Sequence, residues 1–398
     1  LHVSLPDSIT TVGYATGLRK NLSGLVERIT ENQMNKDQIT NPLDAIRGRV
    51  PGLTILKGSN GPAALDAVRL RGTTSLTTGN DPLIIVDGVP VLNSESFQNL
   101  NSDDIENISV LKDGSASIYG AKAANGVILV TTKKGKSGTN KISYTGEFTM
   151  RMKPSYSNFN IMNSQEQMDV YKNMEQNGSL SFVDSYRASQ SGVYGKMYHL
   201  INQYSATGGV FGLANTPEAR GAYLKQAEFR NTDWFDLLFS NSISQNHAVS
   251  MATGTDKASY YTSISVMNDP GWTKRSKVQR YTANINSTYN IFKNLTLNLI
   301  GNASFRKQQA PGTLGSQADP VSGEVKRDFD INPYSFALNT SRTLDPNEYY
   351  VRNYAPFNIF HELDNNYMDL KVTDMRFQGE MKWKPIQKVE LSILGAYK

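Results

Sequence analysis

The chain has 398 residues, a formal net charge of +5, 38% hydrophobic residues and no cysteine. The lack of cysteine excludes disulfides and thiolate chemistry. No run approaches the roughly 20 apolar residues that a membrane-spanning helix needs, and the modest basic excess is not interleaved with aromatic residues, so we do not predict nucleic-acid binding. Strands that alternate apolar and polar residues remain compatible with this composition.

The first third of the chain predicts a small α+β domain. Residues Leu1–Gly17 are polar and β-branched without a helical period. They carry no signal peptide, which indicates a mature, trimmed or partial chain. Alternating apolar residues then predict strands, and Asn41-Pro42 predicts the start of a helix because Asn caps and Pro fits the first turn. These elements are a strand over Leu22–Arg28, a helix over Leu43–Arg49, and strands over Leu53–Leu56 and Ala67–Arg71.

The stretch from Asp81 to Lys136 carries the strongest pattern. Three short runs bounded by turn residues predict strands over Leu83–Val86, Ile105–Leu111 and Val127–Thr132. The segment Gly114–Gly126 is dominated by small residues and predicts one tight helical turn packed closely on the strands. The unit is a compact β-α-β module.

After the Gly/Lys/Ser stretch Gly135–Gly138 the pattern changes to alternating segments of about ten residues, the length of a tilted membrane strand. We predict strands over Lys141–Met150, Ser244–Thr253, Ser259–Asn268, Arg280–Asn290, Leu295–Phe305, Met375–Lys384 and Val389–Tyr397. Short and long connections alternate strictly, as in an up-and-down outer-membrane barrel. Helices are expected in the first long loop, over Asn163–Asn173 and Thr232–Phe239.

Two segments also carry a resemblance. LKDGSASIYGAKAANGVILVTTKKGK (Leu111–Lys136) and PLIIVDGVPV (Pro82–Val91) resemble the plug domain of TonB-dependent outer-membrane transporters of the SusC/RagA type from Bacteroidota. The resemblance implies an α+β plug domain inside a transmembrane antiparallel β-barrel, of which this chain supplies only part of the strands. The implied domains are an N-terminal TonB-contact segment (1–19), the plug (20–134), a linker (135–140) and the N-terminal part of the barrel with long extracellular loops (141–398).

The resemblance also places a contact with TonB close to a Val-Gly-Tyr-Gly signature, which reads Val12-Gly13-Tyr14-Ala15 here. The expected contact residues are Ser8, Ile9, Thr10, Thr11, Val12, Gly13 and Tyr14. An unstructured β-branched segment can add as a strand to a partner sheet. The alternative is a disordered terminus without a function.

Two further groups of side chains are candidate site residues. Arg69 and Arg71 are spaced two apart in a predicted strand, and we expect them to pair with carboxylates of the surrounding wall; the alternative is an ordinary solvated face. The polar loops Gly72–Asn80 and Asn93–Asn99 are expected to form the floor of a ligand cavity, unless they are only solvated connections. The expected ligand residues are Thr73, Thr74, Ser75, Thr77, Asn80, Asn93, Ser94, Glu95 and Phe97.

Enzyme signatures are absent from the sequence: no two histidines are close, and no nucleophile elbow or metal motif is present. We expect no enzyme, metal or cofactor. The resemblance implies active import of a large nutrient, a glycan oligosaccharide or an oligopeptide, across the cell outer membrane. The implied partners are a SusD-like surface lipoprotein, the TonB-ExbB-ExbD complex, outer-membrane lipid and further barrel strands from the rest of the chain or from a second chain. The alternative is a ligand receptor or signalling protein that does not transport.

Overall fold

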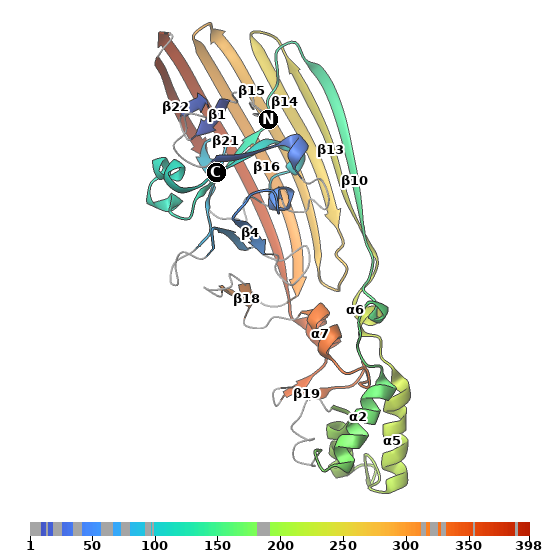
Figure 1. The fold of residues 1–398 in the computed structure, drawn as a ribbon. Helices are drawn as coiled ribbons and strands as arrows, with labels where there is room; N and C mark the ends of the chain where they lie inside the picture. The colour runs from blue at the N-terminus through green and yellow to red at the C-terminus, as the bar shows by residue number, and fades with distance from the viewer. Residues whose placement is uncertain are drawn as a thin grey trace, which may run out of the picture.

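The computed structural model describes residues 9–12, 15–18, 26–34, 42–56, 67–72, 80–91, 97, 99–180, 192–311, 316–318, 325–327, 332–352, 355–386 and 389–398. In this part of the chain the largest sheet has seven strands, each antiparallel to its neighbour in chain order (Figure 1). We call this sheet the wall. Its strands are β10 (Asn140–Arg151), β13 (Ser242–Gly254), β14 (Ala258–Asp269), β15 (Lys277–Phe292), β16 (Leu295–Pro311), β21 (Tyr367–Ile386) and β22 (Val389–Tyr397).

The two faces of the wall differ in the way that alternation predicts. Large apolar side chains project from one face, with Ile142 at 73% and Ile393 at 75% exposure. Asparagine, serine, threonine and arginine side chains on the other face are buried, among them Asn284, Asn286 and Arg376. A face of exposed apolar residues and an opposite polar face are the signature of a membrane barrel strand. The prediction of seven barrel strands is therefore confirmed, and they form part of a barrel.

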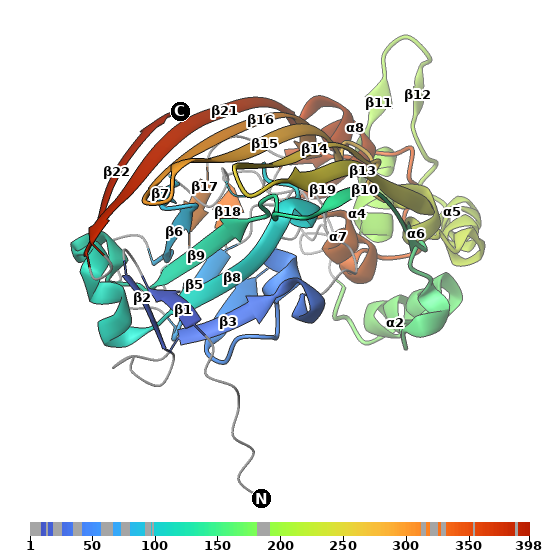
Figure 2. The same cartoon turned by 90° about the horizontal axis from the view of Figure 1, so that it is seen from above.

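The plug is a second sheet on the concave side of the wall (Figure 2). Its strand order is β3-β8-β9-β6-β7, with β6 parallel to β9 and the other pairs antiparallel. The strands are β3 (Val26–Thr30), β6 (Leu83–Val86), β7 (Val89–Pro90), β8 (Ile105–Leu111) and β9 (Val127–Thr132). A separate hairpin is formed by β4 (Leu53–Leu56) and β5 (Ala67–Leu70). The strands β4, β6, β8 and β9 have the predicted bounds. β5 ends at Leu70 instead of Arg71, and β3 spans Val26–Thr30 where Leu22–Arg28 was predicted.

The helical segments of the plug whose bounds the structure describes are 3-10 helices. The predicted helix over Leu43–Arg49 is η3 (Pro42–Ile46), and the small-residue segment forms η6 (Asp113–Tyr119) and η7 (Ala121–Ala123). Two further turns are η2 (Glu31–Gln33) and η5 (Ser102–Asp104). Gly126 ends this segment at a close approach, because a Cβ at this position would lie 2.2 Å from Leu70 Cδ2. The close approach joins the β4–β5 hairpin to the main plug sheet.

The long connections of the wall form a helical lobe at one end of the strands (Figure 1). Its helices are α2 (Ser164–Gln176), α4 (Gly192–Asn202), α5 (Pro217–Arg230), α6 (Trp234–Leu238), α7 (Pro333–Asn339) and α8 (Ile359–Asn365). They share one core in which Tyr194, Phe235 and Leu363 are fully buried. The lobe and its surroundings also contain three short strand pairs, β11–β12 (Tyr204–Ser205, Val210–Phe211), β17–β18 (Ser316–Ala318, Val325–Arg327) and β19–β20 (Tyr350–Arg352, Ala355–Phe357).

Two contacts order the end of the wall from which the lobe continues: an ion pair within the wall, and an aromatic contact between the lobe and the β14–β15 connection. Arg151 at the end of β10 donates to both carboxylate oxygens of the fully buried Asp269 in β14, at 2.7 and 2.8 Å. The ring of Trp272 lies 5.6 Å from that of Phe239 in the lobe core. A bidentate pair restricts both distance and orientation, so the Arg151–Asp269 pair joins β10 to β14 within the wall. The contact between Phe239 and Trp272 joins the lobe to the β14–β15 connection.

Among the described helices, none combines the length and the apolar composition that would let it cross a membrane.

Candidate functional site

The turn between β6 and β7 brings the plug against the wall. Asp87 and Gly88 both have positive φ, 49° and 87°, which is the type I′ turn that an Asp-Gly pair favours in a two-residue hairpin. The tip of this hairpin meets β22, because a Cβ on Gly88 would lie 3.3 Å from Leu394 Cδ1. The sequence IVDGVP therefore forms a hairpin whose tip rests on the wall.

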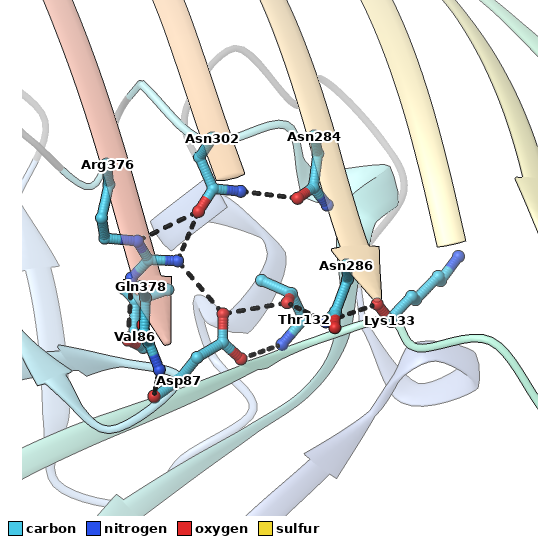
Figure 3. Close-up of polar contacts among 9 residues, drawn as sticks. All are labelled: Val86, Asp87, Thr132, Lys133, Asn284, Asn286, Asn302, Arg376 and Gln378. Carbon is cyan, nitrogen blue, oxygen red and sulfur yellow. Dashed lines mark hydrogen bonds and ion pairs between the residues drawn. The ribbon is translucent and has the colours of Figure 1, made fainter. Parts of the chain in front are cut away.

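Asp87 is held from two sides. Its Oδ1 accepts the backbone N–H of Thr132 at 2.9 Å, and its Oδ2 accepts the Thr132 hydroxyl at 2.9 Å. From the wall, Arg376 Nη2 reaches Asp87 Oδ2 at 3.2 Å (Figure 3). The side chains of Arg376 and Asp87 are 9% and 4% exposed. A buried ion pair is stable only when further hydrogen bonds satisfy both partners, and the contacts to Thr132 supply these for the carboxylate.

The remaining donors of Arg376 are also satisfied. Arg376 Nη1 donates to the carbonyl of Val86 at 2.8 Å, and Nε and Nη2 donate to Asn302 Oδ1 at 3.0 and 2.6 Å. Asn302 in turn donates to Asn284 Oδ1 at 2.6 Å. Figure 3 shows this chain of side chains running from the plug hairpin across three wall strands. We call Asp87, Thr132, Asn284, Asn302 and Arg376 the Arg376 network.

Further hydrogen bonds join the plug to the wall. Gln378 donates to the carbonyl of Asp87 at 2.7 Å, and Asn286 donates to the carbonyl of Lys133 at 3.2 Å. Tyr261 donates its hydroxyl to Asp104 Oδ1 at 2.9 Å. Burial raises the pKa of Asp104, and the hydrogen bond from Tyr261 acts in the opposite direction. The plug–wall contact is thus built of directional polar bonds.

Arg69 pairs within the plug, while the pairing of Arg71 with a carboxylate of the wall stays a prediction. Arg69 is buried, but its carboxylate partner is Asp81 of the plug itself, at 2.6 Å. Arg71 lies beyond the end of β5 in the left-handed conformation (φ 62°), so the two arginines do not share a strand face. In the ion pair of Arg376 with Asp87, the wall supplies the arginine and the plug the carboxylate. The contact of Arg376 with the plug was not predicted, because in the alternating pattern of a strand this arginine does not differ from any other polar residue that faces the lumen.

The predicted ligand residues fall into two groups. Asn80 and Phe97 are described, and both are buried; Phe97 has no exposed surface and packs in the plug core with Ile46 and Ile128. A ligand cannot reach the Phe97 side chain in this conformation, because the plug core covers it. The other predicted ligand residues lie outside the described residues: Thr73, Thr74, Ser75, Thr77, Asn93, Ser94 and Glu95.

The predicted TonB-contact segment is partly described. Ile9–Val12 forms strand β1, which pairs antiparallel with β2 (Ala15–Leu18), so that Thr11 faces Thr16. Ser8, Gly13 and Tyr14 lie outside the described residues. The expectation of an unstructured segment is therefore wrong for residues 9–12, which already have an extended backbone paired on one side.

Comparison with known proteins agrees with this architecture. Residues 19–127 match the TonB-dependent Receptor Plug Domain family. The chain is 30% identical over 295 residues to the TonB-dependent receptor SusC of Bacteroides thetaiotaomicron, covering 72% of this chain and 25% of SusC. It is 29% identical over 373 residues to the TonB-dependent receptor P26 of Formosa agariphila, covering 88% of this chain and 34% of P26. The chain thus spans between a quarter and about a third of the length of these relatives.

The fold has a counterpart among solved structures. The RagAB peptide importer in its open-open state superposes with a TM-score of 0.71 at 21% identity, over 98% of this chain and 42% of the importer chain. At 21% identity, this match establishes that the two chains share a fold. The plug family and the partial barrel define the chain as the plug and part of the barrel of a TonB-dependent receptor. Within that class, its homology to SusC and its likeness in fold to RagAB identify it as SusC/RagA-type.

Proposed function

We propose that the chain is the plug and first part of the barrel of an importer that takes up a large nutrient across the cell outer membrane, driven by TonB. The proposed boundaries are the plug at residues 20–134, a linker at 135–140 and barrel from 141 onward. The observation that carries the proposal is the polar plug–wall contact centred on Arg376 and Asp87. Directional bonds hold a plug in place, yet they can be exchanged for bonds to water when the plug moves.

The energy source follows from the location. The outer membrane holds no ATP and no sustained ion gradient, so work has to arrive through a protein contact. Strand β1 offers an extended backbone near the start of the chain, and its pairing with β2 occupies one of its two edges. We propose that TonB adds a strand to the other edge of β1, or replaces β2, through main-chain hydrogen bonds. The contact region proposed is residues 8–14.

The proposed cargo is a glycan oligosaccharide, or else an oligopeptide, bound in cooperation with a SusD-like surface lipoprotein. Neutral Ser, Thr and Asn side chains in the loops at 72–80 and 93–99 suit the hydroxyl groups of sugars. The helical lobe is proposed as a side wall of the ligand cavity, because the contact of Phe239 with Trp272 places it at the end of the wall strands that carries the long loops.

Uptake measurements test the proposal. Cells that carry the full-length protein should accumulate a labelled oligosaccharide or oligopeptide when TonB is present. In otherwise identical cells without TonB, they should only bind it at the surface. Surface binding without accumulation in both strains would contradict import and favour the receptor that does not transport.

A further inference from the structure

Three lysines lie on the apolar face of the wall, on three neighbouring strands. Lys277 begins β15, Lys307 lies in β16 and Lys371 lies in β21, and all three residues are exposed. Side chains two or four positions apart in a strand share a face. Lys277 therefore shares its face with the exposed Tyr281, and Lys307 shares its face with the exposed Phe305. We call Lys277, Lys307 and Lys371 the lysine cluster.

The lysine cluster lies just beyond the apolar band of these strands. Tyr281 and Phe305 are directly opposite each other in the β15–β16 pair. From these two rings toward the long connections, the same face continues with Gln279 and Lys277 in β15 and with Lys307 in β16. Aromatic rings in barrels mark the level at which hydrocarbon gives way to lipid headgroups. The lysines therefore lie at the headgroup level of the outer leaflet.

The register of the wall brings the positive charges together. Lys307 and Lys371 are directly opposite each other in the β16–β21 pair. Lys277 is opposite Gln309, two positions from Lys307, so Lys277 and Lys307 are diagonal neighbours. Like charges directly opposite each other in a sheet are destabilising. A negative ligand between them replaces this repulsion with attraction, so the arrangement suits an anion that bridges adjacent strands.

The acidic residues nearby have other partners. Asp369, on the same strand face as Lys371, accepts from Gln309 Nε2 at 2.8 Å. Asp364 lies 3.9 Å from Lys274 Nζ. Within the part of the chain that the structure describes, no carboxylate forms an ion pair with a side chain of the lysine cluster. Three positive charges thus face outward against the single negative charge of Asp369.

We propose that the lysine cluster binds the negatively charged, phosphorylated headgroup of a lipid in the outer leaflet. A lysine ammonium is a common phosphate ligand, and each lysine close to an anionic lipid surface strengthens binding. The apolar face beside the cluster, with Tyr281 and Phe305, receives the acyl chains of the same molecule. A soluble anion would use only the lysines, whereas a lipid uses both parts of the surface. Lipid binding on this face is independent of the cargo that the importer carries.

The site lies on strands that also hold the plug. Asn302 and Arg376 of the Arg376 network are directly opposite each other in the β16–β21 pair, as Lys307 and Lys371 are. The two pairs lie on opposite faces of the same two strands. A headgroup that bridges the two lysines therefore ties together the strands whose other face binds the plug.

The first test is native mass spectrometry of the purified full-length protein in detergent. The protein is titrated with monophosphoryl lipid A, with phosphatidylcholine, whose headgroup has no net charge, and with inorganic phosphate. We expect lipid A to bind more tightly than phosphatidylcholine, and its affinity to fall as the salt concentration rises, because the lysines are exposed. Equal binding of the two lipids would overturn the proposal. Full displacement of lipid A by inorganic phosphate at the same concentration would overturn a lipid as the ligand.

The second test uses matched double variants. Lys307→Gln with Lys371→Gln should lower the affinity for lipid A about ten- to thirtyfold. The thermal stability of the lipid-free protein should be unchanged or slightly higher, because the repulsion between opposed charges is removed. Lys382→Gln with Lys384→Gln is the control, since it removes two charges from the same strand that already pair with glutamates, at 3.1 and 3.0 Å.

The control variant should bind lipid A as the unaltered protein does. An equal loss of affinity in the two double variants would show that overall charge attracts the lipid, and would contradict a site at the lysine cluster. Unchanged affinity after Lys307→Gln with Lys371→Gln would contradict it as well.

Discussion

At the scale of single residues, Arg376 joins the two parts of the molecule. It donates to Val86 and Asp87 of the plug and to Asn302 of the wall, while almost completely buried. Its partner Asp87 lies 289 positions away in the chain. The Asp-Gly turn was predictable from the sequence because the pair favours this hairpin. The arginine that binds it was not, because pairing over such a separation depends on the register of the wall strands.

The first prediction concerns this ion pair. Arg376→Ala should destabilise the folded full-length protein by about 3–5 kcal/mol, because it leaves the Asp87 carboxylate buried without its countercharge. Thermal unfolding of the purified protein in detergent measures the loss. Lys153→Ala is the control, since Lys153 pairs with Asp236 where both side chains are about half exposed. It should cost at most about 1 kcal/mol. Equal stability of the two variants would show that the buried Arg376–Asp87 pair stabilises the protein no more than the exposed Lys153–Asp236 pair does.

At the scale of elements, the alternation of apolar and polar residues predicted all seven wall strands, but not their lengths. β21 runs over Tyr367–Ile386, whereas the sequence predicted Met375–Lys384, and β16 continues to Pro311. The wall strands pair with each other beyond the length that the membrane requires, as Pro311 opposite Tyr367 shows. Turn residues and membrane thickness predict where a strand must exist. Backbone pairing with a neighbour decides where it ends.

The second prediction concerns the β6–β7 hairpin. Gly88→Val and Gly138→Val both place a side chain at positive φ, 87° and 72°, and both carry that conformational cost. Only Gly88→Val also meets the wall, where a Cβ would lie 3.3 Å from Leu394, whereas nothing lies within 4 Å at Gly138. We expect Gly88→Val to destabilise the protein by about 1–3 kcal/mol more than Gly138→Val does. Plug proteolysis by trypsin, compared between the two variants, measures the difference, and equal rates would contradict the contact.

The third prediction concerns β1. Thr11→Pro should abolish uptake while surface binding of the ligand persists, because proline removes a backbone donor and fixes φ. Thr11→Ala should reduce uptake only slightly, since strand addition depends on the backbone more than on side-chain identity. Radiolabelled uptake and surface binding, measured on the same cells, separate the two effects. Normal uptake after deletion of residues 8–14 would contradict the assignment of this segment as the TonB contact.

At the scale of the whole molecule, the plug lies against the concave, polar face of the wall, and the helical lobe continues from one end of the strands (Figures 1 and 2). The class of fold was predictable because strand alternation and the plug motifs are local patterns. The contents of the interface were not, because Arg376, Gln378, Asn286 and Tyr261 become plug contacts only through the curvature and register of the wall. The proposed import of a large solute requires that the plug leaves some of these contacts.

Covalent fixation of the plug tests this account most directly, and the chain contains no cysteine to interfere. Asn286 of the wall approaches the Thr132 hydroxyl of the plug to 3.5 Å, so Thr132→Cys with Asn286→Cys can be joined by a short thiol-reactive crosslinker. Thr288→Cys with Asn298→Cys, a directly opposed pair within the wall, is the control. We expect that crosslinking the plug pair abolishes TonB-dependent accumulation but not surface binding, and that crosslinking the wall pair changes neither. Undiminished accumulation with the plug pair fully crosslinked would contradict it.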